Sequence, residues 1–156
     1  MPIEPFISYR LRYILVDRKT EQMDLMNLRL RPVQNQKIEK VLEVLLKVGK
    51  ADYVSVVSHS GQNICHLGEL EDVDLPSVSS LAAGFHAASS SLAGMLGEEA
   101  APRLMNYGEK RSMIMAPVGR LGLILMVVSK KRRNQKKVAT SLKQAGQVIE
   151  DIMAND

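Results

Sequence analysis

Hydrophobic and polar positions beyond residue 35 follow two alternating periods, one typical of helices and the other typical of strands. Apolar residues three and four positions apart predict an amphipathic helix that ends near Gly49, namely Ile38, Val41, Leu42, Leu45 and Leu46. Residues 51–58 are rich in β-branched side chains, and a tight-turn sequence, His59–Gln62, separates them from residues 63–67. This part of the chain therefore predicts a helix followed by two antiparallel strands.

The run Pro76–Gly97 is predicted to form one helix, with Asp74 at its N-cap and Pro76 in its first turn. Its larger apolar residues have helical spacing and are expected to face the core: Val78, Leu81, Phe85, Ala88, Leu92 and Met95. A second stripe, about a third of a turn away, carries only small side chains: Ser80, Gly84, Ala87, Ser91 and Gly94.

Small side chains along one face of a helix let another backbone come close. Glycine inside a helix costs roughly 1 kcal/mol relative to alanine, so Gly84 and Gly94 predict a contact that compensates for this cost. Two interpretations stay open at this point. The helix is either buried between two layers of its own domain or packed against a helix of a second chain.

Three more strands and a final helix are predicted after Gly97. Residues 103–107, 112–118 and 121–128 alternate or run apolar, and short glycine-containing sequences separate them. Apolar residues at helical spacing follow over residues 135–153, at Val138, Leu142, Ala145, Ile149 and Ile152. The predicted fold class is α+β, in the order α-β-β-α-β-β-β-α. A five-stranded antiparallel sheet would carry the central helix on one face and the two flanking helices on the other.

Residues 1–33 differ in pattern and are predicted to be an N-terminal extension, with residues 34–156 forming the domain. Alternation over residues 9–16 favours a strand, followed by a second apolar stretch that would complete a hairpin, although a helix over residues 7–15 is the competing interpretation. Pro32 marks the end of the extension because proline cannot donate to a strand ladder.

Composition narrows the class of protein. The 156 residues are enough for one domain, and a single cysteine, Cys65, excludes an internal disulfide and suits the reducing cytoplasm. Apolar neighbours predict that Cys65 is a buried, inert thiol. The apolar runs are too short to span a membrane, so no membrane partner is expected. Scarce aromatic residues, with no Trp, argue against stacking of single-stranded nucleic acid.

The sequence offers little that would support catalysis or cofactor binding. His59, Cys65 and His66 do not predict a metal site, because adjacent residues of a strand point to opposite faces. His86 lies off both helix stripes and is expected to be exposed or to face a partner. The phosphate-binding glycine motifs and the G-x-S-x-G elbow are lacking, so neither a nucleotide nor another cofactor is expected.

The net charge of +4 is concentrated in a run of basic residues between residues 130 and 137. A solvated loop is the simplest interpretation, an acidic partner the second and nucleic acid the third, for the run that begins Lys130, Lys131, Arg132 and Arg133. Arg120, in a predicted hairpin turn, is a candidate arginine finger, although arginine is common in turns.

The element order and the run from Asp74 to Glu98 resemble the Roadblock/light-chain-seven family, and most closely its bacterial MglB-type regulators of Ras-like GTPases. The likeness covers roughly residues 35–153 and rests on three sequences, ADYVSVVSHSGQNICHLG, SLAAGFHAASSSLAGMLGE and RLMNYGE. The spacing of the small-residue helix between two groups of strands is its most specific feature. The N-terminal extension and the basic final loop depart from the family pattern.

The resemblance implies a homodimer whose sheets join edge to edge and whose central helices lie together. It also implies a non-enzymatic regulator that offers this platform to a Ras-like small GTPase and remodels it. The residues assigned to the interface on the central helix are Ser80, Gly84, Ala87, Ser91 and Gly94, with a possible edge-strand contact through Arg103, Met105 and Tyr107. Lys130 to Arg133 are assigned to an acidic partner. The alternative is a scaffold that binds another Roadblock-family protein; a small-ligand sensor is disfavoured.

Overall fold

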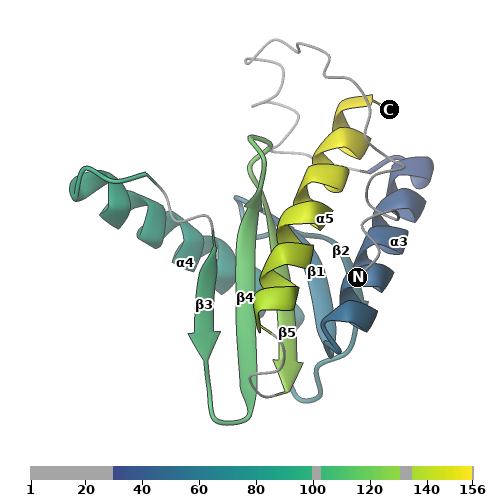
Figure 1. Cartoon of the computed structure of the whole chain (residues 1–156), viewed down its shortest axis with the longest axis horizontal. Helices are drawn as coiled ribbons and strands as arrows, with labels where there is room; N and C mark the ends of the chain where they lie inside the picture. Colours follow the sequence, from purple (N-terminus) through teal and green to yellow (C-terminus); the bar gives the residue numbers. More distant parts are fainter. Residues whose placement is uncertain (1–29, 100–102, 131–134, 156) are drawn as a thin grey trace.

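The computed structural model describes residues 30–99, 103–130 and 135–155, in which three helices pack on the two faces of one antiparallel sheet (Figure 1). The order of the elements agrees with the prediction from the sequence. The helices and strands are α3 (Pro32–Val48), β1 (Tyr53–Ser58), β2 (Asn63–Gly68), α4 (Leu75–Met95), β3 (Leu104–Tyr107), β4 (Arg111–Val118), β5 (Leu123–Lys130) and α5 (Gln135–Asn155).

The five strands lie in the order β2-β1-β5-β4-β3, and every neighbouring pair is antiparallel. β5 is the central strand and β1 lies beside it; both are almost entirely buried, which explains their continuous apolar sequences. β2 and β3 are the two edges among the described strands. The short β3 was predicted as an edge strand from residues 103–107, and this prediction is confirmed.

One face of the sheet is covered by α3 and α5, which lie side by side (Figure 1). Both helices are strongly amphipathic, and their apolar faces meet β1, β4 and β5 in a core built mostly from large aliphatic side chains. α3 begins where the Arg31 backbone N–H donates to Gln34 Oε1 at 3.0 Å, and it ends at Gly49, as predicted. Leu30, before α3, also packs against this core. The hairpin or helix predicted over residues 1–29 lies outside the described residues.

On the other face of the sheet, α4 is the only helix among the described elements, and its packing corrects the prediction for this helix. The stripe predicted to face the core is largely exposed: Leu81 is 74% exposed, Phe85 42%, Leu92 57% and Met95 85%, and Ala88 is also exposed. Of that stripe, Val78 at the start of the helix packs partly against the core. The buried face consists instead of Ser79, Ala82, Ala83 and His86.

The reason for this reversal lies on the sheet. The strands present large, fully buried side chains to α4, among them Tyr53, Met115, Ile124 and Met126. Because protein interiors pack at high density, a helix above such a layer must contribute small side chains to come close. The serine and alanines of α4 fit this requirement, and the larger residues of the helix are turned away.

Candidate functional site

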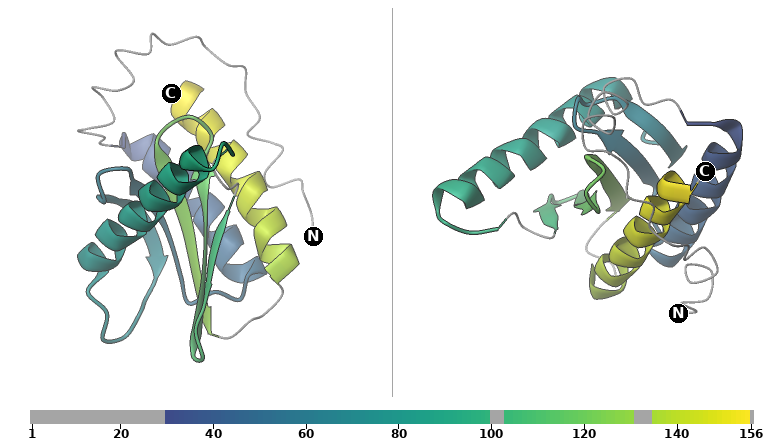
Figure 2. Two further views of the ribbon diagram at one scale, coloured as in Figure 1. Left: turned by 90° about the vertical axis from the view of Figure 1, so that its left-hand side faces the viewer. Right: turned by 90° about the horizontal axis from the view of Figure 1, so that it is seen from above.

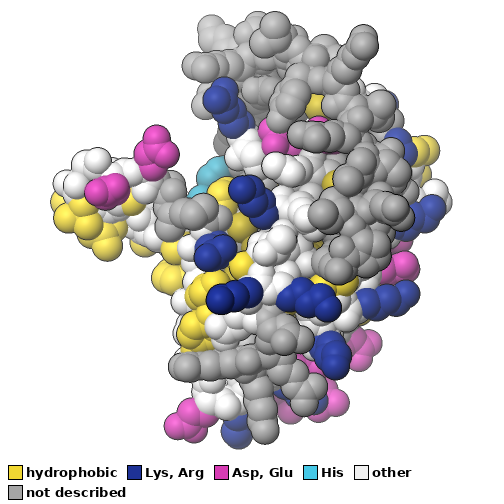
Figure 3. Space-filling model, in the orientation of Figure 1, with side chains coloured by type: hydrophobic (Ala, Val, Ile, Leu, Met, Phe, Trp, Pro, Cys, Tyr) yellow, Lys and Arg dark blue, Asp and Glu magenta, His cyan; other side chains and the backbone are white. Residues whose placement is uncertain are grey.

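The exposed apolar side chains of α4 form the most unusual surface of the molecule. We call this surface the apolar stripe and define it as Leu81, Phe85, Leu92, Met95 and Leu96, all of them exposed large hydrophobic residues. Figure 3 shows hydrophobic side chains gathered along one side of α4 and continuing down the β3 edge of the sheet. A contiguous apolar surface of this kind marks an interaction site in a folded protein.

The second half of α4 projects beyond the edge of the sheet (Figure 2). His86 is the last buried residue of the helix, and the remaining residues up to Met95 are exposed or half-buried. A Cβ atom added at Gly84 or Gly94 would meet no other atom within 4 Å in the described residues. The projecting half therefore makes little contact with its own domain.

The small side chains predicted to form an interface lie together on α4. Ser80, Gly84, Ala87, Ser91 and Gly94, which we call the small-residue stripe, are all exposed and lie beside the apolar stripe on the helix. The stripe begins near the β1–β2 turn, where the Cα of Ser80 lies close to Gly61. The single chain thus shows that the small-residue stripe is not buried inside its own domain.

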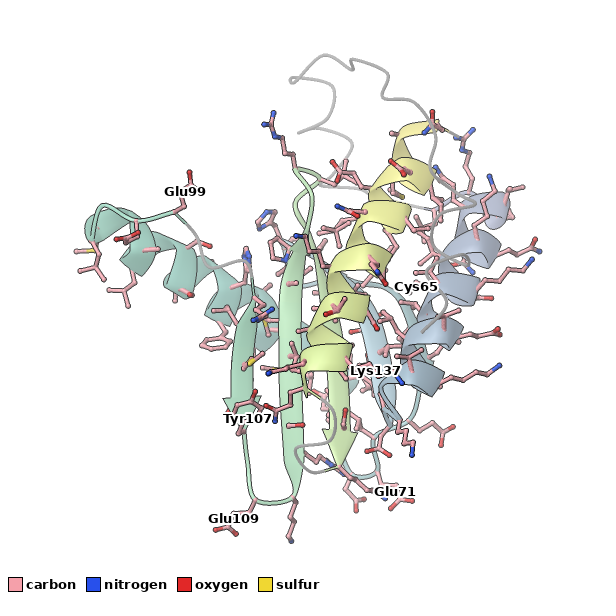
Figure 4. All side chains as sticks on the ribbon, in the orientation of Figure 1. Cys65, Glu71, Glu99, Tyr107, Glu109 and Lys137 are labelled. Atoms are coloured by element: carbon pink, nitrogen blue, oxygen red, sulfur yellow. The ribbon has the colours of Figure 1, made fainter. Side chains whose placement is uncertain are left out.

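β3 is an edge of the sheet among the described strands, and it lies next to the apolar surface (Figure 3). Its side chains alternate between the two faces, since Leu104 packs on the α4 side and Met105 on the opposite side. The Tyr107 hydroxyl donates to Gln135 Oε1 at 2.5 Å and thereby ties β3 to the start of α5 (Figure 4). Arg103 precedes the strand and is exposed. A short, anchored strand at the edge of a sheet can accept a strand from another molecule.

His86 was expected to be exposed or to face a partner, and this prediction is wrong for the single chain. The side chain is 8% exposed and its ring lies 5.9 Å, centroid to centroid, from that of His59 in the β1–β2 turn. The i, i+3, i+4, i+7 spacing of the buried face could have revealed His86, but the more apolar stripe obscured it. His86 thus joins α4 to the sheet.

Cys65 and His66 point to opposite faces of the sheet, as predicted. Cys65 belongs to the core beneath α3 and α5, whereas the His66 ring lies 5.7 Å from that of Tyr53, a residue of the α4 side. Burial, together with the nearby Glu39, raises the pKa of the Cys65 thiol to about 11. The thiol therefore stays protonated near neutral pH and does not act as a nucleophile.

None of the described charged residues singled out in the sequence belongs to α4. Lys130 ends β5 and is exposed, whereas residues 131–133 of the basic run lie outside the described part of the chain. Arg120 is exposed in the β4–β5 turn. Near Lys130, an open hollow of about 800 Å³ is lined by side chains of both signs, including Glu71 and Glu109 (Figure 4). Ligand pockets are mostly apolar and enclosed, so the hollow does not resemble one.

The described residues contain no group of three or more His, Cys, Asp or Glu side chains placed to hold a metal ion. None of their helices combines the length and apolar character needed to cross a bilayer.

Comparison with known proteins agrees with this architecture. The chain is 32% identical to the solved structure of Myxococcus xanthus MglB, covering 75% of this chain and 94% of that one with a TM-score of 0.70. It is 25% identical to the gliding protein MglB from Thermus thermophilus, covering 80% of this chain and 94% of that one with a TM-score of 0.71. A third structure, described as MglB with a tetrameric arrangement, shares the fold at 24% identity, with coverages of 80% and 93% and a TM-score of 0.74.

A search of curated proteins finds no match. The sequence profile of the Roadblock/LC7 domain, however, matches residues 37–129, which span the elements from α3 to β5. The profile and the agreement in fold and sequence with the M. xanthus protein together show that this chain belongs to the Roadblock/LC7 family.

Proposed function

We propose that this protein is a dimeric, non-enzymatic regulator of a Ras-like small GTPase. The single observation that carries the proposal is the uncovered face of α4, which combines exposed large hydrophobic residues with an exposed row of small ones. The likeness to MglB proteins, one of them described as a gliding protein, supports a role in bacterial motility or polarity.

The apolar stripe is the surface that a second copy of the chain covers. Its part after His86, at Leu92, Met95 and Leu96, lies at the end of α4 that extends past β3, and the hydrophobic surface continues down that strand edge (Figure 3). If two β3 strands pair across a two-fold axis, each α4 reaches over the sheet of the other copy. This arrangement would remove Leu92 and Met95 from water and give β3, an edge among the described strands, a second neighbouring strand.

The small-residue stripe is the surface that the GTPase contacts. Ala87 and Ser91 lie one turn apart in its middle, and both are exposed. Since nothing larger than a hydroxymethyl group projects there, a segment of the partner can approach the helix backbone closely. Gly84 and Gly94 lower the stability of the isolated helix, and such a contact would offset that cost.

The protein acts by binding the GTPase and supplies no catalytic group, so the GTPase itself carries out the hydrolysis. α4 contains no Asp, Glu, Lys or Arg between Leu75 and Met95, and its one histidine, His86, is buried. Arg120 belongs to the β4–β5 turn and not to α4. We therefore expect stimulation, if it occurs, to arise from remodelling of the GTPase active site.

Single-turnover GTP hydrolysis by the cognate GTPase, with and without this protein, tests the proposal. We expect the wild-type chain to change the hydrolysis rate and the variant with Ala87→Arg and Ser91→Arg to bind the GTPase at least about tenfold more weakly, or about 1.4 kcal/mol. Arginine would fill the gap and place charge in a desolvated contact. Thr140→Arg with Gln147→Arg adds the same charge to exposed positions of α5 and should leave binding unchanged.

Two results would contradict the proposal. The arginine variant of α4 could stay folded and bind the GTPase as tightly as the wild-type chain does, which would exclude the small-residue stripe. Alternatively, the wild-type chain could fail to bind the GTPase in either nucleotide state while it binds another Roadblock-family protein. That second result would favour the scaffold interpretation.

A further inference from the structure

The contact between His59 and His86 lies at the point where α4 leaves the sheet. His86 is the last of the four buried residues of the helix, and the exposed, projecting half follows directly. Histidine side chains are visible at this junction in Figure 3. The contact is edge-on, with the two rings inclined by 61°. A change in this contact therefore affects the last buried residue that holds α4 to its own domain.

His59 is itself held in place by both hairpin turns. Its backbone N–H donates to the Gly122 carbonyl oxygen at 3.0 Å, which links the β1–β2 turn to the β4–β5 turn. The ring covers Gly122, where an added Cβ would lie only 2.4 Å from a ring carbon. His59 therefore cannot move away from His86 without disturbing the two turns.

His86 is an unusual buried group. Neither of its ring nitrogens is solvent-exposed or has a hydrogen-bond partner among the described residues. A buried polar group without partners is costly, and a buried charge without partners costs more. Burial lowers the pKa of His86 below its ordinary value of 6.5, and the neighbouring His59 lowers the same pKa further.

None of the described groups around α4 makes a hydrogen bond with the His86 ring; the Glu150 carboxylate of α5 lies against Gly119 in the β4–β5 turn and makes none with the ring either. The β1–β2 turn presents His59, and the β4–β5 turn that His59 contacts carries the cationic Arg120. Beneath α4 the sheet presents apolar side chains and Tyr53, whose hydroxyl accepts a hydrogen bond from Asn63 Nδ2 at 2.8 Å. The described surroundings of His86 thus favour its neutral form.

We propose that the His59–His86 contact is a pH-sensitive latch, in which protonation of His86 releases the second half of α4 from the sheet. In the neutral form the ring packs between the helix and the turns. In the cationic form it is repelled by His59 and gains hydration only by leaving its buried position. The helix that carries His86 must move with it.

The two states of α4 differ in how readily His86 binds a proton, and this difference sets the direction in which pH shifts the equilibrium between them. In the released state His86 takes up a proton near its ordinary pKa of 6.5, whereas in the latched state it does so only at lower pH. The latched state is therefore fully favoured above about pH 6.5 and loses stability as the pH falls from there towards the pKa of the buried ring.

A consequence for partner binding rests on the function proposed above. If α4 carries the surfaces for a second copy and for the GTPase, then release of α4 weakens both contacts in acid. The latch itself concerns the free chain, so it is tested without any partner. Its failure would leave the proposed function intact.

Amide hydrogen exchange of α4 in the full chain, at one protein concentration and from about pH 7.5 to about pH 5.5, measures the release. After correction for intrinsic exchange rates, we expect the opening equilibrium of the amides after Ala83 to rise several-fold in the wild-type chain. Each tenfold rise corresponds to about 1.4 kcal/mol. His86→Leu removes the titrating group and keeps an apolar side chain, so it should abolish this rise.

His66→Gln is the matched control, because it removes an exposed imidazole from β2 and should leave the rise unchanged. If His86→Leu does not fold, His59→Gln provides the second variant and should reduce the rise, since it removes the neighbouring ring but not the burial. An NMR titration that shows the His86 ring protonating below pH 6.5 would support the latch. An equal rise in wild-type and His86→Leu chains, or no rise in the wild-type chain, would overturn it.

Discussion

The two faces of the sheet are built in opposite ways. On one face, α3 and α5 turn their large aliphatic residues inward and leave polar residues outside. On the other face, α4 turns serine, alanine and histidine inward and leaves leucine, phenylalanine and methionine outside. The first face is complete in the single chain. The second face has the composition of a surface that another molecule completes.

This contrast separates residues that stabilise the domain from residues that are available for association. Leu42 of α3 and Leu92 of α4 are the same residue type on helices of the same sheet, yet the first is 0% exposed and the second 57%. The buried Leu42 contributes to the free energy of unfolding of the single chain. The exposed Leu92 can contribute to the free energy of association when a partner covers it.

The largest effect on stability is expected from Leu42→Ala. The free energy of unfolding should fall by about 2–5 kcal/mol, because the substitution leaves a cavity in the core beneath α3 and α5. Leu92→Ala is the matched change and should alter the unfolding of the dissociated chain by less than about 0.5 kcal/mol. Urea unfolding at low protein concentration measures both. Equal losses in the two variants would show that the second face is not free.

Ala83→Leu tests why α4 turns small residues inward. The larger side chain would meet the layer formed by Met115, Ile124 and Met126, and we expect a loss of about 1–3 kcal/mol from overpacking. Ala87→Leu, on the exposed small-residue stripe, should leave unfolding nearly unchanged. Thermal unfolding of the two variants checks this difference. A fully stable Ala83→Leu chain would contradict the packing explanation.

Gly84→Ala should separate folding from association. Open space surrounds the position in the single chain, so alanine should stabilise the helix by roughly 0.5–1 kcal/mol. The same methyl group should weaken binding of the GTPase if a partner backbone approaches Gly84 closely. Unfolding and binding titrations on one preparation measure both quantities. Improved stability with unchanged binding would remove Gly84 from the contact.

The smallest effect on the stability of the domain is expected from removing residues 1–29. We propose that the N-terminal extension is dispensable for the fold, because the structure shows a complete unit of helices and sheet from α3 onward. A chain that begins at Leu30 retains the side chain that packs on the core and the backbone donor that caps α3. Its unfolding should stay cooperative. Loss of a cooperative transition would place the extension inside the domain.

The sequence predicted most of the fold because most of its elements bury one regular face. The apolar spacing of Ile38 to Leu46 fits only a helix, and the β-branched run of β1 fits only a strand. α4 was located correctly, but the stripe of larger apolar residues predicted to face the core is largely exposed. Periodicity alone could not decide which face meets the sheet, because that choice depends on the size of Tyr53 and Met126 in distant strands.

The role of His86 could not be predicted from sequence patterns either, because it also depends on residues that are distant in the chain. Its environment is created by two turns that are far apart in the chain, at His59 and Gly122, and by the lack of hydrogen-bond partners among the described residues. Neither feature leaves a local pattern around residue 86. Cys65 was easier to interpret, since its apolar neighbours on a strand already indicated burial.

Sedimentation equilibrium at micromolar concentration tests most directly whether the uncovered face of α4 is an interface. We predict that the wild-type chain sediments at twice its chain mass. A variant with Leu92→Asp and Met95→Asp should sediment at the chain mass while its circular dichroism stays unchanged, because both residues are exposed in the single chain. A wild-type protein that is strictly monomeric, or a folded double variant that remains dimeric, would contradict the assignment of this face to a dimer interface.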